Sequence, residues 1–252
     1  MGNCVVRKVI LHYHLFKNAG TSVDVLLEQG FENQWVTREF PVADHVANVN
    51  QVAMWVLTKP DAMVFSSHTA LMPPPVLEGI EFFPVMFVRH PIDRIASVYS
   101  FERKQGGNTF GAVLARNTAL AGYLETRLAL PSDRQCRNFH ASRLSQFLPV
   151  ADGPERMRAM GAMERLPFLG LVERFDVSVA RMVQWLRPHF PSVREATVSA
   201  NVSRDHSVSL EERLARIEHE LGPQLYARLL QANQIDLAIH TALCERYAEA
   251  EA

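Results

Sequence analysis

The segment HLFKNAGTS, residues 14–22, brings a lysine, two small residues and two hydroxyl side chains together directly behind an apolar run. The apolar run VVRKVILHY predicts a buried strand over residues 5–13, and residues 21–28 have the apolar spacing of a helix. A helix that begins just after a strand offers an anion its unpaired N–H groups and a partial positive charge. Lys17 adds a full positive charge at this position. The segment therefore has the chemistry of a phosphate-binding loop.

The small and hydroxyl-bearing residues of this loop have distinct predicted roles. Ala19 and Gly20 let the backbone approach a ligand closely, and Thr21 and Ser22 add hydroxyl donors. In an equally weighted alternative, Thr21 or Ser22 only caps the helix and Lys17 is solvated. The nucleotide P-loop, GxxxxGK(S/T), fits poorly, because here the lysine precedes the glycine and the loop is shorter. The sequence also shows no predicted strand that ends in an aspartate placed to hold magnesium beside the loop.

A second anion-binding element is predicted in FVRHPIDRIASVYSFER. Arg89 lies at the end of a buried strand, residues 83–90, and Ser97 lies two turns into the helix that Pro91 opens. An arginine at a strand end can bind phosphate through two hydrogen bonds. The alternative is an ordinary ion pair with Asp93 and a serine bonded to its own helix backbone. Two such elements in one chain favour a ligand with phosphates at both ends.

These two elements resemble a known family. HLFKNAGTS is similar to the 5′-phosphosulfate loop of sulfotransferases that use 3′-phosphoadenosine 5′-phosphosulfate (PAPS), and VRHPIDRIASVY is similar to their 3′-phosphate element. The resemblance implies a P-loop-like three-layer fold, PAPS as the cofactor and adenosine 3′,5′-bisphosphate (PAP) as its product. The cofactor contacts that it implies come from Lys17, Asn18, Ala19, Gly20, Thr21, Ser22, Arg89, Ser97 and Arg204.

Three further segments are similar to the carbohydrate branch of that family, which includes heparan sulfate 2-O- and 6-O-sulfotransferases and chondroitin 4-O-sulfotransferases. They are DRQCRNF (133–139), FLGLVERFDVSVARM (168–182) and NVSRDHSVS (201–209). Two positions depart from the family pattern, since Phe16 replaces the usual proline before the lysine and His90 replaces the usual aspartate after the arginine. The chain lacks the membrane anchor of the Golgi enzymes, which indicates a bacterial-type relative.

The resemblance implies transfer of the sulfuryl group of PAPS to a hydroxyl acceptor, with a carbohydrate expected. In such an in-line displacement, positioning and charge stabilisation dominate catalysis. Lys17 is predicted to stabilise the leaving 5′-phosphate as the S–O bond breaks. This scheme requires no metal.

A histidine is predicted to act as the base for the acceptor hydroxyl. His68 ends the short strand AMVFSSH and falls where this branch carries its catalytic histidine, although Ser67 replaces the usual glycine. His45 is the second candidate. His12 and His14 share one face of a strand, but with no third metal ligand in view we expect buried structural roles.

The elements that must position these residues alternate along the chain between strands and helices. Further strands are predicted near QWVTREF and over residues 62–68 and 168–173, and the chain from about Ser209 is predicted to be helical. This order predicts an α/β fold with a parallel sheet covered on both faces. With no repeats and no convincing linker, residues 1–252 are expected to form a single domain.

The bulk composition excludes several classes of protein. Apolar residues make up 48% of the 252 residues, which supports a real core. Lys and Arg total 26 against 27 Asp and Glu, so a general nucleic-acid or membrane binder is not expected. Three widely spaced cysteines, Cys4, Cys136 and Cys244, indicate free thiols. With no predicted transmembrane segment or signal peptide, we expect a soluble, cytoplasmic protein.

Two other functions remain open, a P-loop-type kinase and a non-catalytic anion-binding module. The acceptor is not specified by the sequence, and a small molecule or a lipid-linked hydroxyl is an alternative to a glycan. The loops LMPPPVLEG (71–79) and FERKQGGNTFGAVLARN (101–117) are predicted to form walls of the acceptor site.

Overall fold

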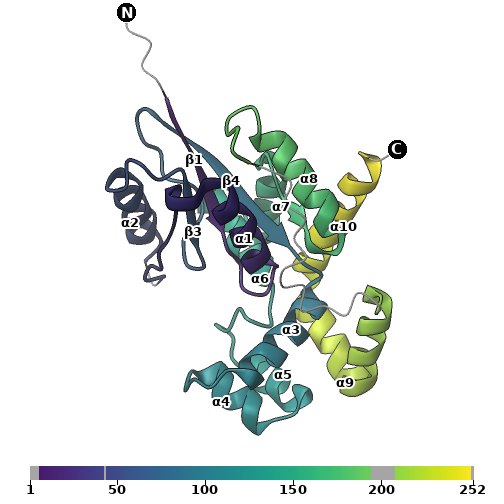
Figure 1. Ribbon diagram of the computed structural model, residues 1–252. Coiled ribbons are helices and arrows are strands. Elements are labelled where there is room, and N and C mark those ends of the chain that lie inside the picture. Colours follow the sequence, from purple (N-terminus) through teal and green to yellow (C-terminus); the bar gives the residue numbers. More distant parts are fainter. Residues whose placement is uncertain (1–5, 43, 194–207, 251–252) are drawn as a thin grey trace, which may run out of the picture.

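Five strands form one sheet in the computed structural model, which describes residues 6–42, 44–193 and 208–250 (Figure 1). The strands are β1 (Arg7–Tyr13), β2 (Trp35–Thr37), β3 (Val64–Ser67), β4 (Ile80–Val88) and β5 (Gly170–Leu171). They lie in the order β2-β3-β1-β4-β5, and every neighbouring pair is parallel. The predicted α/β fold with a parallel central sheet is confirmed.

Ten α-helices accompany the sheet within the described ranges. They are α1 (Gly20–Phe31), α2 (His45–Leu57), α3 (Pro91–Lys104), α4 (Phe110–Asn117), α5 (Leu120–Ala129), α6 (Phe139–Leu144), α7 (Glu155–Arg165), α8 (Phe175–Leu186), α9 (Leu210–Ala232) and α10 (Gln234–Glu249). Residues that favour a helix N-terminus mark the start of several of these helices. Pro91 occupies the first turn of α3, the Asp44 side chain caps α2, and Ser209 forms a capping box with Glu212 at α9.

Helices cover both faces of the sheet because the strand residues alternate between two cores. Val9, Leu11 and Tyr13 of β1 face a core shared with α2, α6, α7 and α10. Ile10 of β1, with residues of β3 and β4, faces a second core shared with α1 and α8. Helices, sheet and helices thus form the three expected layers.

A third core lies apart from the sheet. Buried side chains of α3, α4, α5 and α9 pack together, with Tyr123, Leu124 and Leu229 almost inaccessible to solvent. In Figure 1 these helices extend beyond the end of the sheet at which α3 begins. The predicted helical C-terminal part is therefore divided, since α9 joins this cluster and α10 returns to the sheet.

Some local predictions need correction. Helix α1 (Gly20–Phe31) begins one residue earlier and ends three residues later than the predicted 21–28. The strand predicted over residues 168–173 is reduced to Gly170–Leu171, since Val172 already begins a 3-10 turn. Cys136 and Cys244 are free thiols, as expected. Among the described residues, no helix has both the length and the apolar character needed to cross a bilayer.

Candidate active site

The residues expected to do chemistry gather at the C-terminal edge of the sheet. The phosphate loop follows β1, His68 follows β3 and Arg89 follows β4. Strand β1 lies between the other two, and Tyr13 at its end is in register with Ser67 and Met86. In the sheet, β2 and β3 lie on one side of β1, and β4 and β5 lie on the other. Open α/β sheets bind ligands at the point where the strand order changes direction in this way.

The phosphate loop turns tightly between β1 and α1. Lys17 and Ala19 both have positive φ angles, 62° and 60°, which non-glycine residues rarely adopt. Ala19 is the N-cap residue, and no side chain caps α1. The alternative in which Thr21 or Ser22 serves as a cap is therefore not observed. With no acidic residue in its first turn, the helix N-terminus suits an anion.

The packing of the loop leaves no room for a side chain at Gly20. This reason for a glycine adds to the close backbone approach to a ligand that was expected from the sequence. A Cβ atom at this position would lie 2.1 Å from Cδ2 of His14. The imidazole of His14 therefore occupies the space that a side chain at residue 20 would need.

Lys17 and Arg89, from the two predicted anion elements, are brought together. The guanidinium of Arg89 donates from Nη1 to the carbonyl oxygen of Lys17 at 3.2 Å. The ammonium of Lys17 lies 4.8 Å from the centre of the Phe101 ring. The loop after β1 and the loop after β4 are thus joined by a hydrogen bond.

Arg89 also forms the ion pair that the sequence offered as an alternative. Its Nε donates to Asp93 at 2.7 Å, and Arg213 of α9 donates to the same carboxylate at 2.9 Å. Burial raises the pKa of Asp93, but the two guanidinium groups outweigh this and lower it below its usual value. Ser97 is half-buried one turn after Asp93, on the same face of α3.

His68 is oriented by a carboxylate that the sequence analysis missed. Its Nδ1 lies 2.8 Å from Oε1 of Glu39, and both side chains are 49% exposed. Because a carboxylate only accepts hydrogen bonds, Nδ1 carries a proton in this contact, and in the neutral imidazole Nε2 is then the nitrogen with the lone pair. Burial raises the pKa of Glu39, but hydrogen bonds from Thr69 and His68 lower it overall. This carboxylate stays ionised near neutrality and fixes the tautomer of His68.

His14 stacks on His68, with ring centres 3.8 Å apart. Its Nδ1 bonds Oδ2 of Asp24 at 2.7 Å, and Nδ1 of His12 bonds Oδ1 of the same carboxylate at 2.7 Å. Burial raises the pKa of Asp24, but the charge and hydrogen bonds of the histidines lower it far more. The structural roles expected for His12 and His14 are thus explained by hydrogen bonds to Asp24. Asp24 also supplies a third possible metal ligand, which the sequence analysis had not found. His12, His14 and Asp24 together offer nitrogen and oxygen ligands of the kind that zinc binds.

Asn18 anchors the loop to the far end of the chain. Its Oδ1 lies 2.8 Å from Nε2 of His140, and Nδ1 of His140 lies 3.0 Å from Asp236 of α10. His140 and Asp236 are fully buried. Burial lowers the pKa of His140, whereas hydrogen bonds from His140 and Ala141 outweigh the effect of burial on Asp236 and lower its pKa. Asn18 is therefore held in place by a buried polar chain as well as being a predicted ligand contact.

The remaining sequence predictions fall at the margins of this site. His45, the second candidate base, lies at the start of α2, where its Nε2 bonds the carbonyl oxygen of Met72. Glu173, within the segment resembling GLxERFD, bonds the backbone N–H of His90 and the imidazole of His240. Arg204 lies outside the described residues.

The fold and this edge define an α/β protein in which lysine, arginine and histidine side chains gather at the ends of the central strands. No family model matches the chain. A protein of Archaeoglobus fulgidus described as uncharacterized is 40% identical over 253 residues, and the match covers 96% of this chain and 98% of that protein. The chain belongs to the same family as this archaeal protein.

Proposed function

We propose that this protein is a sulfotransferase that moves the sulfuryl group of PAPS to a hydroxyl acceptor. One observation carries the proposal. Arg89 is hydrogen-bonded to the backbone of Lys17, so the two elements that resemble the 5′ and 3′ phosphate sites of PAPS enzymes adjoin each other. Each element alone has an ordinary structural explanation. The two elements meet beside β1, where the strand order changes direction, and two anion-binding elements at such a position suit a ligand with phosphates at both ends.

The proposed reaction is a direct displacement at sulfur. The acceptor oxygen forms a bond to sulfur as the bond from sulfur to the 5′-phosphate oxygen breaks. The leaving phosphate gains negative charge, which Lys17 and the N–H groups at the start of α1 stabilise. Positive charge supplied in this way lowers the barrier because it interacts more strongly with the transition state than with bound PAPS.

His68 is the proposed base in this reaction. It accepts the acceptor proton at Nε2, the nitrogen that Glu39 leaves without a proton. The carboxylate of Glu39 then stabilises the imidazolium that forms. His14 stacks against one face of His68 and limits the orientations that the ring can adopt.

Binding of PAP in the absence of metal tests the proposal. The purified chain, treated with chelator, should bind PAP in a calorimetric titration and gain thermal stability from it. ATP with magnesium should give a much smaller shift in melting temperature. If PAP binding vanishes with chelator, or if ATP with magnesium is preferred, the kinase alternative replaces the proposal. Transfer of labelled sulfate from PAPS to a hydroxyl compound then separates an enzyme from a non-catalytic module.

A further inference from the structure

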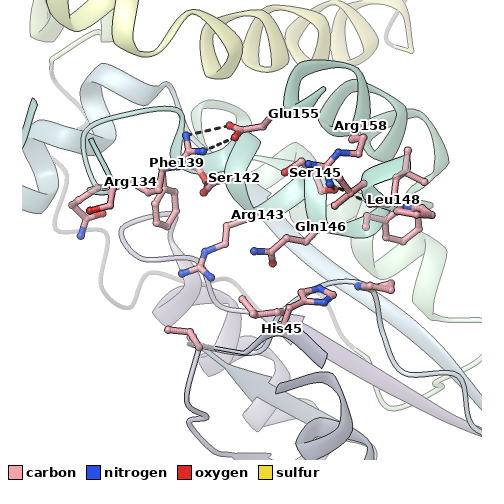
Figure 2. Close-up of a pocket in the computed structure, with 18 residues that line it drawn as sticks. His45, Arg134, Phe139, Ser142, Arg143, Ser145, Gln146, Leu148, Glu155 and Arg158 are labelled. Carbon is pink, nitrogen blue, oxygen red and sulfur yellow. Dashed lines mark hydrogen bonds and ion pairs between the residues drawn. The ribbon is translucent and has the colours of Figure 1, made fainter. Parts of the chain in front are cut away.

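A large pocket lies between the start of α2 and the chain around α6 (Figure 2). Its volume is about 1060 Å³. One wall contains Val42 and His45, which follow β2, and Leu71 and Pro73, which follow β3. The opposite wall is formed by the chain between residues 132 and 158, including α6 and the start of α7. Because the first wall is built from segments that leave the C-terminal ends of strands, the pocket adjoins the edge that carries His68.

Two connections tie this pocket to the catalytic groups. Leu71 lies three residues after His68 in the same loop. Phe139 in the opposite wall is the neighbour of His140, which contacts Asn18 of the phosphate loop. The pocket is therefore connected to His68 and to Asn18 through neighbouring residues of the chain, although neither side chain is among those that line it.

Apolar and polar side chains share the lining of the pocket. The apolar lining is supplied by Val42, Leu71, Pro73, Phe139, Phe147, Leu148, Pro149 and Val150. In Figure 2, Arg143 and Gln146 lie between the wall that carries Phe139 and the wall that carries His45. The Oε1 atom of Gln146 is buried and has no hydrogen-bond partner among the described residues. Such a buried acceptor is costly unless a donor group reaches it.

Arg143 differs from the other arginines of the pocket. Arg134 forms a two-point ion pair with Glu155, and Arg158 donates to the carbonyl oxygens of Gly153, Ser145 and Leu148. For Arg143, the described part of the chain provides no ion pair or hydrogen bond, and its guanidinium lies 5.7 Å from the centre of the Phe139 ring.

Arg143 is half-buried, and burial lowers its pKa. Desolvating a cation without a partner is unfavourable, so an anion that enters the pocket recovers that cost.

We infer that this pocket is the acceptor site, and that it takes a hydroxyl-bearing organic anion whose acidic group binds Arg143 and whose apolar body packs on Phe139 and Phe147. The inference rests on the proposed function, because it names the acceptor class for the same site. An extended glycan presents many hydroxyls and needs many polar partners, whereas six of the ten polar side chains in this lining are already hydrogen-bonded within the chain. They are His45, Arg134, Gln135, Ser142, Glu155 and Arg158. A small amphiphilic carboxylate or sulfonate matches one cation beside apolar side chains.

A pair of fluorescent probes tests the site without turnover. 8-Anilinonaphthalene-1-sulfonate has an apolar body and one anionic group, and N-phenyl-1-naphthylamine has the same rings without the sulfonate. Both should bind the native chain. Arg143→Gln should weaken binding of the sulfonate about ten- to a hundredfold, the value of a charged hydrogen bond, and leave the neutral probe unchanged. Arg143→Lys should restore part of the affinity. Arg228→Gln, an exposed arginine of α9, is the matched control.

Three results would overturn the inference. The first is the absence of sulfonate binding to the native chain, and the second is an equal loss of both probes in Arg143→Gln. The third is displacement of the sulfonate by saturating PAP, which would make the pocket part of the nucleotide site. Calorimetry with PAP on Arg143→Gln is done in parallel and should match the native chain. If PAP fails to bind even the native chain, the proposed sulfotransferase function fails and the acceptor role fails with it, whatever the probes show.

Discussion

His68 is the side chain on which the proposed chemistry depends most directly. If it is the base, His68→Ala should lower the rate of sulfuryl transfer by about 10²–10⁴-fold, the usual range for general base catalysis. PAP affinity should change little, because the imidazole serves the acceptor rather than the nucleotide. The native rate should fall on acidification, since a protonated imidazole cannot accept a proton, and the alanine variant should lose this dependence.

Two further substitutions locate the base. Glu39→Gln should also slow transfer, because an uncharged amide cannot stabilise the imidazolium that forms on His68, whereas Glu81→Gln, on an exposed glutamate, should not. His45→Ala should lose less activity than His68→Ala, because its Nε2 is engaged with the carbonyl oxygen of Met72 and His45 belongs to the wall of the proposed acceptor pocket. An inactive His45→Ala beside a nearly normal His68→Ala would move the base to the start of α2.

Arg89 is expected to recognise the 3′ end of the cofactor. Arg89→Ala should weaken PAP binding about ten- to a hundredfold, the value of a charged hydrogen bond. Adenosine 5′-phosphosulfate, which lacks the 3′-phosphate, should lose much less affinity. Calorimetric titration of both ligands makes the comparison. Equal losses would mean that Arg89 acts through the Lys17 carbonyl and Asp93, as a structural residue of the loop.

The sequence predicted individual site residues where a local pattern marks them. Lys17, His68 and Arg89 each follow an apolar strand, and residues at the ends of parallel strands meet at one edge. Their partners have no such signal. Glu39 is 29 residues from His68, and His140 is 122 residues from Asn18. Only the folded chain brings these pairs within hydrogen-bond distance.

At the scale of an element, Gly20 is the residue on which the start of α1 depends. Gly20→Ala would push a methyl group into the ring of His14, because the added Cβ lies 2.1 Å from that ring. His14 would move, and with it the stack on His68. We expect a loss of stability of about 1–3 kcal/mol from overpacking, and weaker PAP binding.

Urea unfolding and PAP calorimetry on Gly20→Ala measure the two effects. Gly106→Ala is the control, since a Cβ at that loop position meets no atom within 4 Å. Unchanged stability and PAP affinity in Gly20→Ala would show that the loop adapts easily and that His14 does not fix it.

Element types were more predictable than element lengths. The proline at the start of α3 and the capping box at α9 are local signals, and both helices begin where these signals lie. β5 is shorter than predicted because an apolar run marks burial but not backbone conformation. Val172 is buried within a 3-10 turn and keeps the apolar character that predicted a longer strand.

At the scale of the whole molecule, the alternation of strands and helices was enough to predict the layers. It was not enough to predict the separate helical core of α3, α4, α5 and α9. The residues of this core come from sequence segments on either side of β5, so their association depends on tertiary packing. The pocket at Arg143 was missed for the same reason, because its two walls come from distant segments.

The stability of the whole chain should depend on pH through His90, one of the two residues that depart from the sulfotransferase pattern which the sequence resembles. Burial, followed by the positive charge of His240, lowers the pKa of His90 from 6.5 to about 4. Between these values the unfolded chain binds a proton that the folded chain does not. The stability that the folded chain gains from keeping His90 neutral is therefore fully present above pH 6.5, and this contribution is lost as the pH falls toward 4.

The contribution of His90 is isolated by comparing variants. Because the side chain is only partly buried, we expect it to account for about 1–2 kcal/mol of the loss, less than the full pKa difference allows. Urea unfolding at pH 7 and pH 4.5 measures that loss.

His90→Asn has no titrating group and should lose less stability over this interval than the native chain. His219→Asn, on an exposed histidine of α9, should lose as much as the native chain. If His90→Asn and the native chain lose equally, the acid sensitivity comes from the other buried groups, with His140 and Asp236 first among them, and His90 remains protonatable in the folded state.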